Sequence, residues 1–249
     1  MIWSKLFKKK AKFLKEPIDL GLLHTDMHSH LIPGIDDGSR SMEDSITLIK
    51  AMWDLGYRKL ITTPHVMNDF YKNTPEIINM GLDSVRAELK RQGINMELEA
   101  AAEYMLDDGF MEKLKAGNLQ TFGNNYILVE LSYIAEPPNL NSIFFELQTN
   151  GFQVILAHPE RYNYWHSDFS KYQDLFDRNI LLQMNINSLT GWYSHESKHI
   201  AEKLIENNLI SFLGSDLHNT NYLNELKKSR YMPALQKAIE SGKILNAKL

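Results

Sequence analysis

Two pairs of residues with metal-binding side chains stand near opposite ends of the chain. His28 and His30 are separated by one residue, and Asp216 and His218 repeat this spacing. Alternate residues of a strand point to the same face, so each pair can direct both side chains toward one metal ion. Histidines near a single strand end are often ordinary surface residues, but two such pairs predict a metal centre.

Further residues of the same types end the apolar runs that lie between the two pairs. They are His65, Glu103, Glu130 and His158. A buried carboxylate costs free energy unless it is paired with a cation, and a bound metal would account for both glutamates.

Two more carboxylates follow the first pair of histidines. Asp36 and Asp37 lie in the glycine-rich turn PGIDDGS. A carboxylate there could reach the metal centre, or it could accept hydrogen bonds within the turn. The pattern alone leaves both interpretations open.

The elements that must position these residues are short apolar runs separated by segments of helical period, which is typical of βα units around a parallel sheet. The strand-like runs are 24–28, 58–64, 96–102, 126–130, 153–158, 180–185 and 209–215. Metal-binding residues end all of them except 180–185, which ends in Asn185. Because the carboxyl ends of barrel strands face one mouth, the sequence predicts an α/β fold with a closed or nearly closed seven-stranded barrel.

Several segments between the runs have clear helix signals. Ser41 precedes a helix that Gly56 ends, and Thr74 with Pro75 opens a helix that Gly93 ends. Further helices are predicted over 141–150, 170–178, 196–208 and 221–240.

Composition excludes several classes of protein. A chain of 249 residues with 43% apolar content can bury the core of one domain. A net charge of −4 without a basic cluster in the body argues against nucleic acid as a partner. The absence of cysteine excludes a thiolate nucleophile. No apolar run approaches the roughly 20 residues of a membrane span, and no signal-peptide core is visible, so a cytoplasmic location is expected.

The N-terminal segment 1–17 differs from the single barrel domain predicted over 18–249. Its first fifteen residues contain six lysines and no acidic residue, interleaved with apolar side chains. Such an arm could contact an anionic membrane surface, or it could be an ordinary solvated terminus.

Six motifs, in this order, resemble those of the PHP superfamily, the polymerase and histidinol phosphatase domains. They are DMHSHLIPGIDDGS, TTPH, AAAEY, ILVELS, LAHPERY and GSDLHN. The motifs are most similar to those of the superfamily's bacterial tyrosine phosphatases, which are encoded beside the tyrosine kinases that control capsule and exopolysaccharide export. This resemblance extends from about residue 24 to residue 220 and implies a distorted seven-stranded (β/α)7 TIM-like barrel.

The resemblance also implies three divalent ions, commonly manganese (Mn2+), with iron or zinc as alternatives. One ion would be held by His28, His30, Glu130 and Asp216. A second would share Glu130 and add Glu103 and His158. The third would be held by Asp37, His65 and His218. Nine positions of this chain match the ligand pattern.

Arg161 resembles the superfamily's phosphate-binding arginine, and with Asp216 and His218 it completes the expected catalytic set. A planar guanidinium suits this role because it can donate to two phosphate oxygens at once. The alternative for Arg161 is a surface ion pair with Glu160. Tyr162, Tyr164 and Trp165 could either flank an aromatic substrate or pack their loop against the barrel.

The implied activity is hydrolysis of phosphotyrosine by in-line attack of a metal-bound hydroxide. The expected substrate is the tyrosine-rich tail of a membrane-anchored bacterial tyrosine kinase. Three alternatives stay open on the sequence alone: a histidinol-phosphate phosphatase or other phosphoesterase with the same barrel, a hydrolase of the amidohydrolase or TatD type, and a non-catalytic scaffold that retains the barrel.

Overall fold

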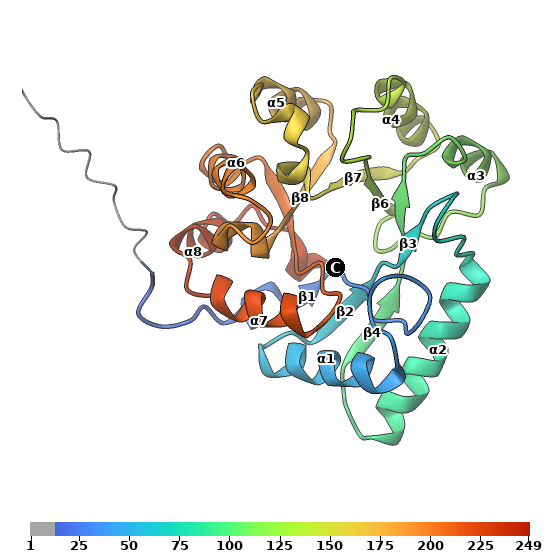
Figure 1. Cartoon of the computed structure of the whole chain (residues 1–249), viewed down its shortest axis with the longest axis vertical. Helices are drawn as coiled ribbons and strands as arrows, with labels where there is room; N and C mark the ends of the chain where they lie inside the picture. The colour runs from blue at the N-terminus through green and yellow to red at the C-terminus, as the bar shows by residue number, and fades with distance from the viewer. Residues whose placement is uncertain (1–12) are drawn as a thin grey trace, which may run out of the picture.

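Parallel strands form a ring in the computed structural model, which describes residues 13–249 (Figure 1). The strands are β1 (Thr25–Asp26), β2 (Lys59–Thr62), β3 (His65–Val66), β4 (Glu97–Ala100), β5 (Glu103–Met105), β6 (Tyr126–Glu130), β7 (Gln153–Ala157), β8 (Leu181–Asn185) and β9 (Ile210–Gly214). One sheet has the order β1-β2-β4 and the other the order β3-β5-β6-β7-β8-β9. Every strand pairing within the two sheets is parallel.

The nine strands correspond to the seven predicted runs. Two residues separate β2 from β3, and two separate β4 from β5, so each of these pairs is one interrupted run along the chain. The first parts of these runs, β2 and β4, belong to the three-stranded sheet. The second parts, β3 and β5, belong to the six-stranded sheet. The predicted parallel α/β architecture is therefore confirmed.

The ring closes between its first and last strands, beyond the ends of β1 and β9. Ser29 forms an isolated parallel bridge with Leu217. The backbone N–H of Asp216 donates to His28 O at 2.9 Å, and that of His30 donates to Leu217 O at 2.9 Å. These main-chain bonds place the two predicted metal-binding pairs side by side, although they are far apart in the sequence.

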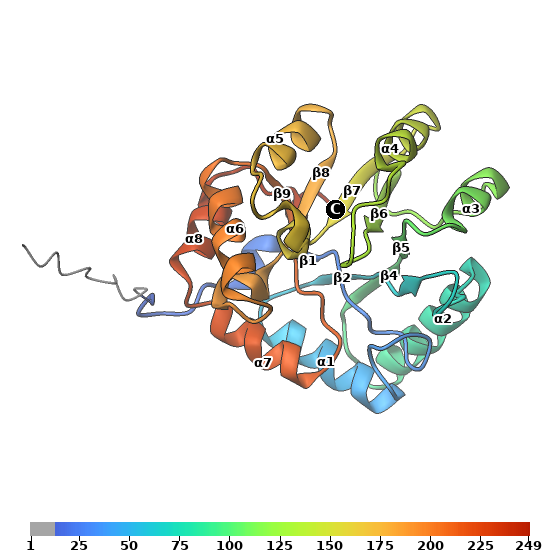
Figure 2. The same cartoon turned by 45° about the horizontal axis from the view of Figure 1, so that its top comes forward.

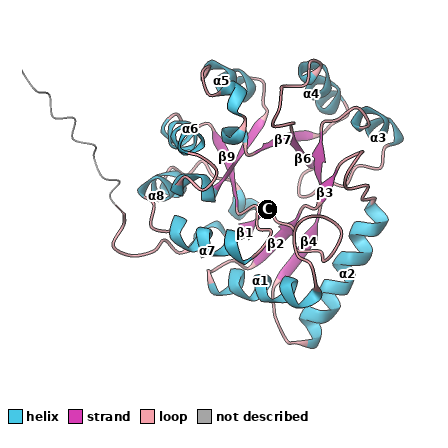
Figure 3. Cartoon of the chain, viewed as in Figure 1, coloured by secondary structure: helices cyan, strands magenta, loops and turns pink. Residues whose placement is uncertain are grey.

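Eight α-helices surround the ring in the described part of the chain (Figures 1 and 3). They are α1 (Met42–Asp54), α2 (Pro75–Arg91), α3 (Phe110–Ala116), α4 (Leu140–Thr149), α5 (Ser170–Asp177), α6 (His195–Glu206), α7 (Thr220–Ser229) and α8 (Pro233–Glu240). The turned view shows the α-helices around the outside of the strands (Figure 2).

The capping signals of the first two helices act as predicted. The Ser41 side chain accepts a hydrogen bond from Asp44 N at the start of α1, and Thr74 accepts one from Ile77 N at the start of α2. The predicted helix 221–240 is wrong, because it is two helices, α7 and α8. Pro233 has no backbone N–H to continue the first helix, so the chain turns there and begins a new one. The sequence analysis also missed α3, which is only seven residues long.

Two apolar layers hold the barrel. The inner layer fills the ring with side chains such as Met27, Leu128, Ile155 and Phe212. The outer layer lies between strands and helices and includes the residues that alternate with the inner ones, for example Val129. Side chains at the mouth continue the inner face, and Glu130 does so because it follows Leu128 by two residues.

The predicted arm 1–17 is described only in its last residues, and residues 1–12 lie outside the described part. Leu14 N donates to Tyr231 O at 2.8 Å, and Ile18 N donates to Arg230 O at 2.9 Å, so this segment is fixed to the turn between α7 and α8. Within residues 13–249, none of the helices is both long and apolar enough to cross a membrane.

Candidate metal centre

All nine predicted ligand residues meet at one mouth of the ring. They come from the ends of β1, β6, β7 and β9, from the starts of β3 and β5, and from the loop after β1. Eight of them are buried: His28, His30, His65, Glu103, Glu130, His158, Asp216 and His218. The ninth, Asp37, has a side chain that is 54% exposed, so the centre opens to solvent on its side.

Glu103 occupies the middle of this arrangement. Its Oε2 lies 3.2 Å from His28 Nε2, 3.5 Å from His30 Nε2 and 3.1 Å from His65 Nδ1. Its Oε1 lies 2.9 Å from His158 Nε2. One carboxylate therefore contacts four of the five histidines.

Glu130 lies further from the first histidine pair than the sequence analysis expected. Its Oε1 is 2.9 Å from His65 Nδ1, and its Oε2 is 4.0 Å from His158 Nε2. No ion pair joins Glu130 to His28 or His30 in residues 13–249, and Glu103 takes that place. The reason is the strand order, because β6 stands one strand further round the ring from β1 than β5 does.

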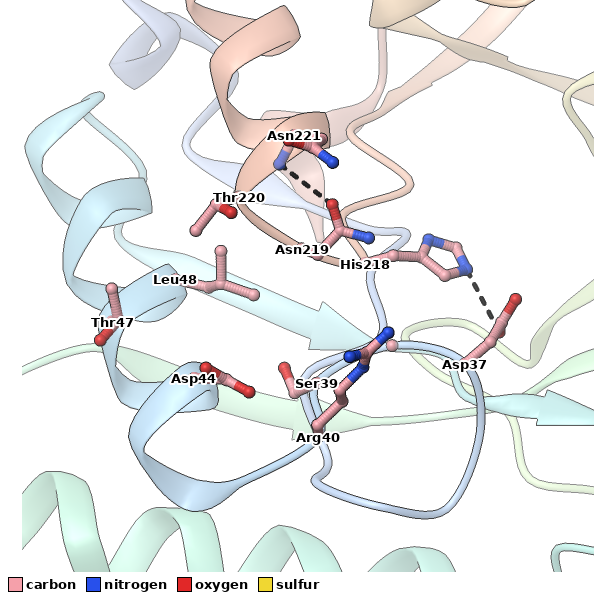
Figure 4. Close-up of a pocket in the computed structure, with 11 residues that line it drawn as sticks. Asp37, Ser39, Arg40, Asp44, Thr47, Leu48, His218, Asn219, Thr220 and Asn221 are labelled. Atoms are coloured by element: carbon pink, nitrogen blue, oxygen red, sulfur yellow. Dashed lines mark hydrogen bonds and ion pairs between the residues drawn. The ribbon is translucent and has the colours of Figure 1, made fainter.

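Asp37 contacts His65 and His218 on the side of the centre that is open to solvent. Its Oδ1 lies 3.5 Å from His65 Nε2 and 3.5 Å from His218 Nε2 (Figure 4 shows the second contact). Three overlapping groups of ligand atoms are close enough to hold an ion. They are His30, Asp37, His65 and His218; His28, His30 and Glu103; and His65, Glu103 and Glu130.

Unsatisfied polar atoms show that these residues suit a metal. Five buried atoms of the centre have no hydrogen-bond partner within the described residues: Nε2 of His28, Nε2 of His30, Nδ1 of His65, Oε2 of Glu103 and Oε1 of Glu130. Their nitrogen and oxygen atoms form contacts of 2.9–3.5 Å without the geometry of a hydrogen bond, so the charges of this group are only partly compensated. Imidazole nitrogen and carboxylate oxygen are common ligands of divalent transition metals, and coordination would satisfy all five atoms together.

Polar groups around the centre orient three of the histidines through hydrogen bonds to Nδ1. His28 Nδ1 lies 2.8 Å from Gln183 Oε1, and His30 Nδ1 lies 2.8 Å from Asp36 Oδ2. His218 Nδ1 lies 2.8 Å from the main-chain oxygen of Asp216. In each case the outer nitrogen is occupied, which leaves Nε2 to face the centre. The sequence analysis missed Gln183 entirely, and for Asp36 it left open whether the carboxylate reaches the metal centre or stays within the turn.

Local backbone strain helps to aim two of the ligands. His158 and Asp216 have φ values of 34° and 52°. These lie in the left-handed region of the backbone, which residues other than glycine rarely adopt. Both follow strand ends, where this turn swings the side chain toward the mouth. Strain of this kind costs about 1–3 kcal/mol and persists where function requires the geometry.

A glycine keeps the interior open beneath these ligands. A Cβ on Gly214 would lie 2.5 Å from Gln183 Nε2 and 2.8 Å from His28 Cβ. Any larger residue at this point of β9 would displace the histidine and the amide that orients it.

The crowded charges shift the pKa values of the ligands in opposite directions. Burial alone would lower the pKa of His28, but the carboxylates of Glu103 and Asp216 outweigh it and raise that pKa to about 9. Burial together with repulsion by Glu103 raises the pKa of Glu130 to about 7. Burial lowers the pKa of His158 to about 4. In the absence of metal, protons bound to His28 and Glu130 therefore offset part of the negative charge of the carboxylates.

Arg161 extends over the rim of the centre from the 3-10 helix η2 (Pro159–Arg161). Its Nη1 donates to Asp216 Oδ2 at 3.2 Å. The guanidinium lies 4.7 Å from the ring centroid of Tyr133 and 4.1 Å from that of Tyr193, so the two rings hold it in place. Its remaining N–H groups make no hydrogen bond within residues 13–249 and can reach a bound anion.

The alternative of an ion pair between Arg161 and Glu160 is wrong. The Glu160 carboxylate is buried and points away, and its Oε1 accepts from Asn185 N at 3.0 Å and from the Ser188 hydroxyl at 2.6 Å. Arg161 is thus free of its neighbour and directed to the centre.

The three aromatic residues after Arg161 pack their loop. Tyr162 is fully buried, and its hydroxyl donates to Ala157 O at 3.0 Å. The Tyr164 hydroxyl donates to Ser132 O, and the Trp165 indole donates to Glu136. The structure thus favours packing over contact with substrate for this group.

Comparisons with known proteins agree with this geometry. A family profile described as capsular polysaccharide synthesis, CpsB/CapC, matches residues 24–241. Tyrosine-protein phosphatase YwqE of Bacillus subtilis is 30% identical over 200 residues, which cover 80% of this chain and 79% of that protein.

Solved structures extend the similarity to three dimensions. A chain from crystal structures of YwqE from Bacillus subtilis and CpsB from Streptococcus pneumoniae, described as metal-dependent tyrosine phosphatases, matches with a TM-score of 0.75 at 28% identity. The match covers 88% of this chain and 87% of that one. An amidohydrolase from Mycoplasma synoviae matches with a TM-score of 0.55 at 12% identity over 96% of this chain and 88% of that one. The second match shows a shared fold only.

Proposed function

The chain belongs to the CpsB/CapC family of capsular polysaccharide synthesis, and from that premise we infer that it is a metal-dependent protein-tyrosine phosphatase. The observation that carries this conclusion is the set of five unsatisfied ligand atoms that converge at the barrel mouth beside Arg161. A binding site for metal and a donor for phosphate therefore share one open face.

We propose that the nine residues hold three divalent ions. Distances favour one group of His28, His30, Glu103 and Asp216. A second group shares Glu103 and adds Glu130 and His158. The third consists of Asp37, His65 and His218. Mixed imidazole and carboxylate ligands suit Mn2+, and they also accept iron and zinc.

Bound divalent ions would supply two effects, a lower pKa for coordinated water and compensation of the negative charge on the phosphoryl oxygens. The protein's own contribution is position. Arg161 is proposed to donate to two phosphoryl oxygens, because its planar fork is already oriented by two aromatic rings.

Asp216 is proposed to hold Arg161 beside the metal centre, because its carboxylate contacts both. Its Oδ2 accepts from Arg161 and from the Asn185 amide, while its Oδ1 lies 3.4 Å from His28 Nε2. His218, the third proposed catalytic residue, lies on the exposed side beside Asp37, where a substrate would enter.

The chain contains no cysteine, so no phosphocysteine intermediate can form. The leaving phenolate has a parent pKa of about 10, so it departs with less help from an acid than an alkoxide needs.

The natural substrate is proposed to be a phosphotyrosine protein of the capsule system, namely the tyrosine-rich tail of a membrane-anchored tyrosine kinase. The support is family membership together with the exposure of Asp37, which leaves one side of the centre open to solvent. Such a kinase consumes ATP, which places the proposed encounter in the cytoplasm.

The experiment compares phosphate release from a phosphotyrosine peptide, a phosphoserine peptide and histidinol phosphate, with Mn2+ and with chelator. Metal-dependent release from the phosphotyrosine peptide, lost in His28→Ala, is the expected result. Preference for histidinol phosphate would keep the centre but move the enzyme to another substrate class. A protein that neither binds metal nor releases phosphate would be a scaffold.

A further inference from the structure

A cavity adjoins the metal centre between the first turns of α1 and α7 (Figure 4). Its volume is about 300 Å³, at the lower end of the range for small-molecule sites, so it has room for a single side chain. Asp37 and His218 line this cavity and also belong to the metal centre. A peptide that places its phosphoryl group at the centre therefore passes the cavity entrance.

Arg40 supplies the permanent positive charge of this cavity. It is exposed, it stands in the loop before α1, and its guanidinium points from that loop toward the side where Asn219 and His218 lie (Figure 4). Among residues 13–249 the guanidinium has no hydrogen-bond or ion-pair partner, unlike Arg161. A planar donor without a partner beside a phosphatase centre is suited to bind a carboxylate.

The remaining lining residues fit this assignment. Thr47, Asn219 and Thr220 are exposed polar residues that add hydrogen-bonding groups to the wall. Two carboxylates also line the cavity. Asp37 faces His65 and His218 of the metal centre, and Asp44 forms no ion pair with Arg40 and lies in the first turn of α1, where the helix dipole favours an acidic residue. Arg40 is therefore free to pair with a group from outside the chain.

We propose that this cavity is a specificity subsite that takes an acidic side chain flanking the phosphotyrosine of the substrate, with Arg40 binding its carboxylate. The inference rests on the proposed function, because it needs a phosphopeptide at the metal centre. The cavity shares Asp37 and His218 with the metal centre, and adjacent residues of a chain are about 3.8 Å apart, so the acidic residue is sought within two positions of the phosphotyrosine.

The test measures kcat/KM for phosphotyrosine peptides that carry Glu or Gln at each position from two before to two after the phosphotyrosine. The wild-type protein should prefer Glu over Gln at one position by about fivefold, the size expected for a partly exposed ion pair. Arg40→Ala should abolish that preference, and Arg40→Glu should reverse it in favour of a peptide with Lys there. Asp44→Asn, which removes the opposing charge, should increase it.

Arg91→Ala is the matched control, because Arg91 is exposed, bonds only to Glu88 and lies at the far end of α2. It should keep the wild-type preference. Equal rates for Glu and Gln peptides in the wild type, or a preference that survives Arg40→Ala and Arg40→Glu, would overturn the subsite while leaving the phosphatase intact. Failure to hydrolyse any phosphotyrosine peptide would instead reject the proposed function.

Discussion

The imidazole of His28 is oriented toward the metal centre by residues of β8. Gln183 Oε1 fixes Nδ1 at 2.8 Å, and the carboxamide is itself held by Asn185 Oδ1, which accepts from Gln183 Nε2 at 2.9 Å. Both amides are fully buried. Orientation of the first ligand thus depends on residues that never face the substrate.

Gln183→Leu tests this dependence. The change replaces the polar carboxamide with an apolar side chain of similar size and leaves His28 Nδ1 without a partner, so metal affinity should fall about 10-fold to 100-fold. Affinity is measured by competition with a metal-chelating dye. Gln153→Leu, at the exposed start of β7, is the control and should have wild-type affinity. An unchanged affinity in Gln183→Leu would show that the amide has no orienting role.

Protonation of His28 gives the centre a defined pH dependence. Its pKa is raised to about 9 without metal, above the ordinary value of 6.5, so the imidazole carries a proton at pH 7. Only the neutral imidazole binds metal, hence metal binding at pH 7 should release protons, and affinity should weaken as the pH falls.

Calorimetric titration of Mn2+ into chelator-treated protein tests whether metal binding releases protons. The titration is done in two buffers of equal pH but different ionisation enthalpy. The heats should differ at pH 7, and the difference should shrink as the pH approaches the His28 pKa of about 9. Identical heats in both buffers at pH 7 would contradict the assignment.

Sequence analysis named the residues that meet at the barrel mouth but not the residues that orient them. His28 and His30 carry a recognisable spacing and strand position, whereas Gln183 is 155 residues from its partner and has no local signature. The sequence analysis grouped Glu130 with His28, whereas the structure places Glu103 there. Both glutamates end apolar runs, so the sequence pattern is the same for both, and only the order of strands in the ring decides which one reaches His28.

At the scale of elements, side chains complete the closure between β1 and β9. Ser215 donates from its backbone N–H and its hydroxyl to the buried carboxylate of Asp26, at 2.8 and 2.7 Å. Asn246 acts beside this contact, where its side chain accepts from Leu213 N and donates to Leu213 O and Thr25 O. This asparagine replaces the ladder bonds that the two short strands do not make.

Asn246→Ala should therefore destabilise the protein by about 3 kcal/mol, because it leaves buried main-chain groups without partners. Urea denaturation of the metal-loaded protein measures the change. Asn207→Ala, at the exposed end of α6, removes one hydrogen bond and should cost well under 1 kcal/mol. Equal losses in both variants would mean that Asn246 does not hold the barrel closed.

Periodicity and capping predicted most elements correctly. Strands were visible because their runs are apolar and end in polar residues, and α1 and α2 because Ser41 and Thr74 cap them. The α3 helix is too short for its period to stand out, and the break at Pro233 was missed because the apolar spacing continues across it.

At the scale of the whole molecule, a parallel ring brings the carboxyl ends of all its strands to one mouth. Residues from His28 to His218 can therefore share one centre, and the rest of the chain builds the two apolar layers beneath and around it. The fold class followed from the order of strands and helices, which the sequence displays. The grouping of these side chains by distance required the three-dimensional structure.

The most direct test of this account measures bound metal and phosphotyrosine hydrolysis on the same samples as Mn2+ is returned to chelator-treated protein. Hydrolysis should be absent without metal, rise with metal content and saturate with it. Glu103→Gln should lose both properties, while Glu97→Gln, at the exposed start of β4, should keep them. Full activity in a sample without bound metal, or full metal loading without phosphotyrosine hydrolysis, would contradict the central claim.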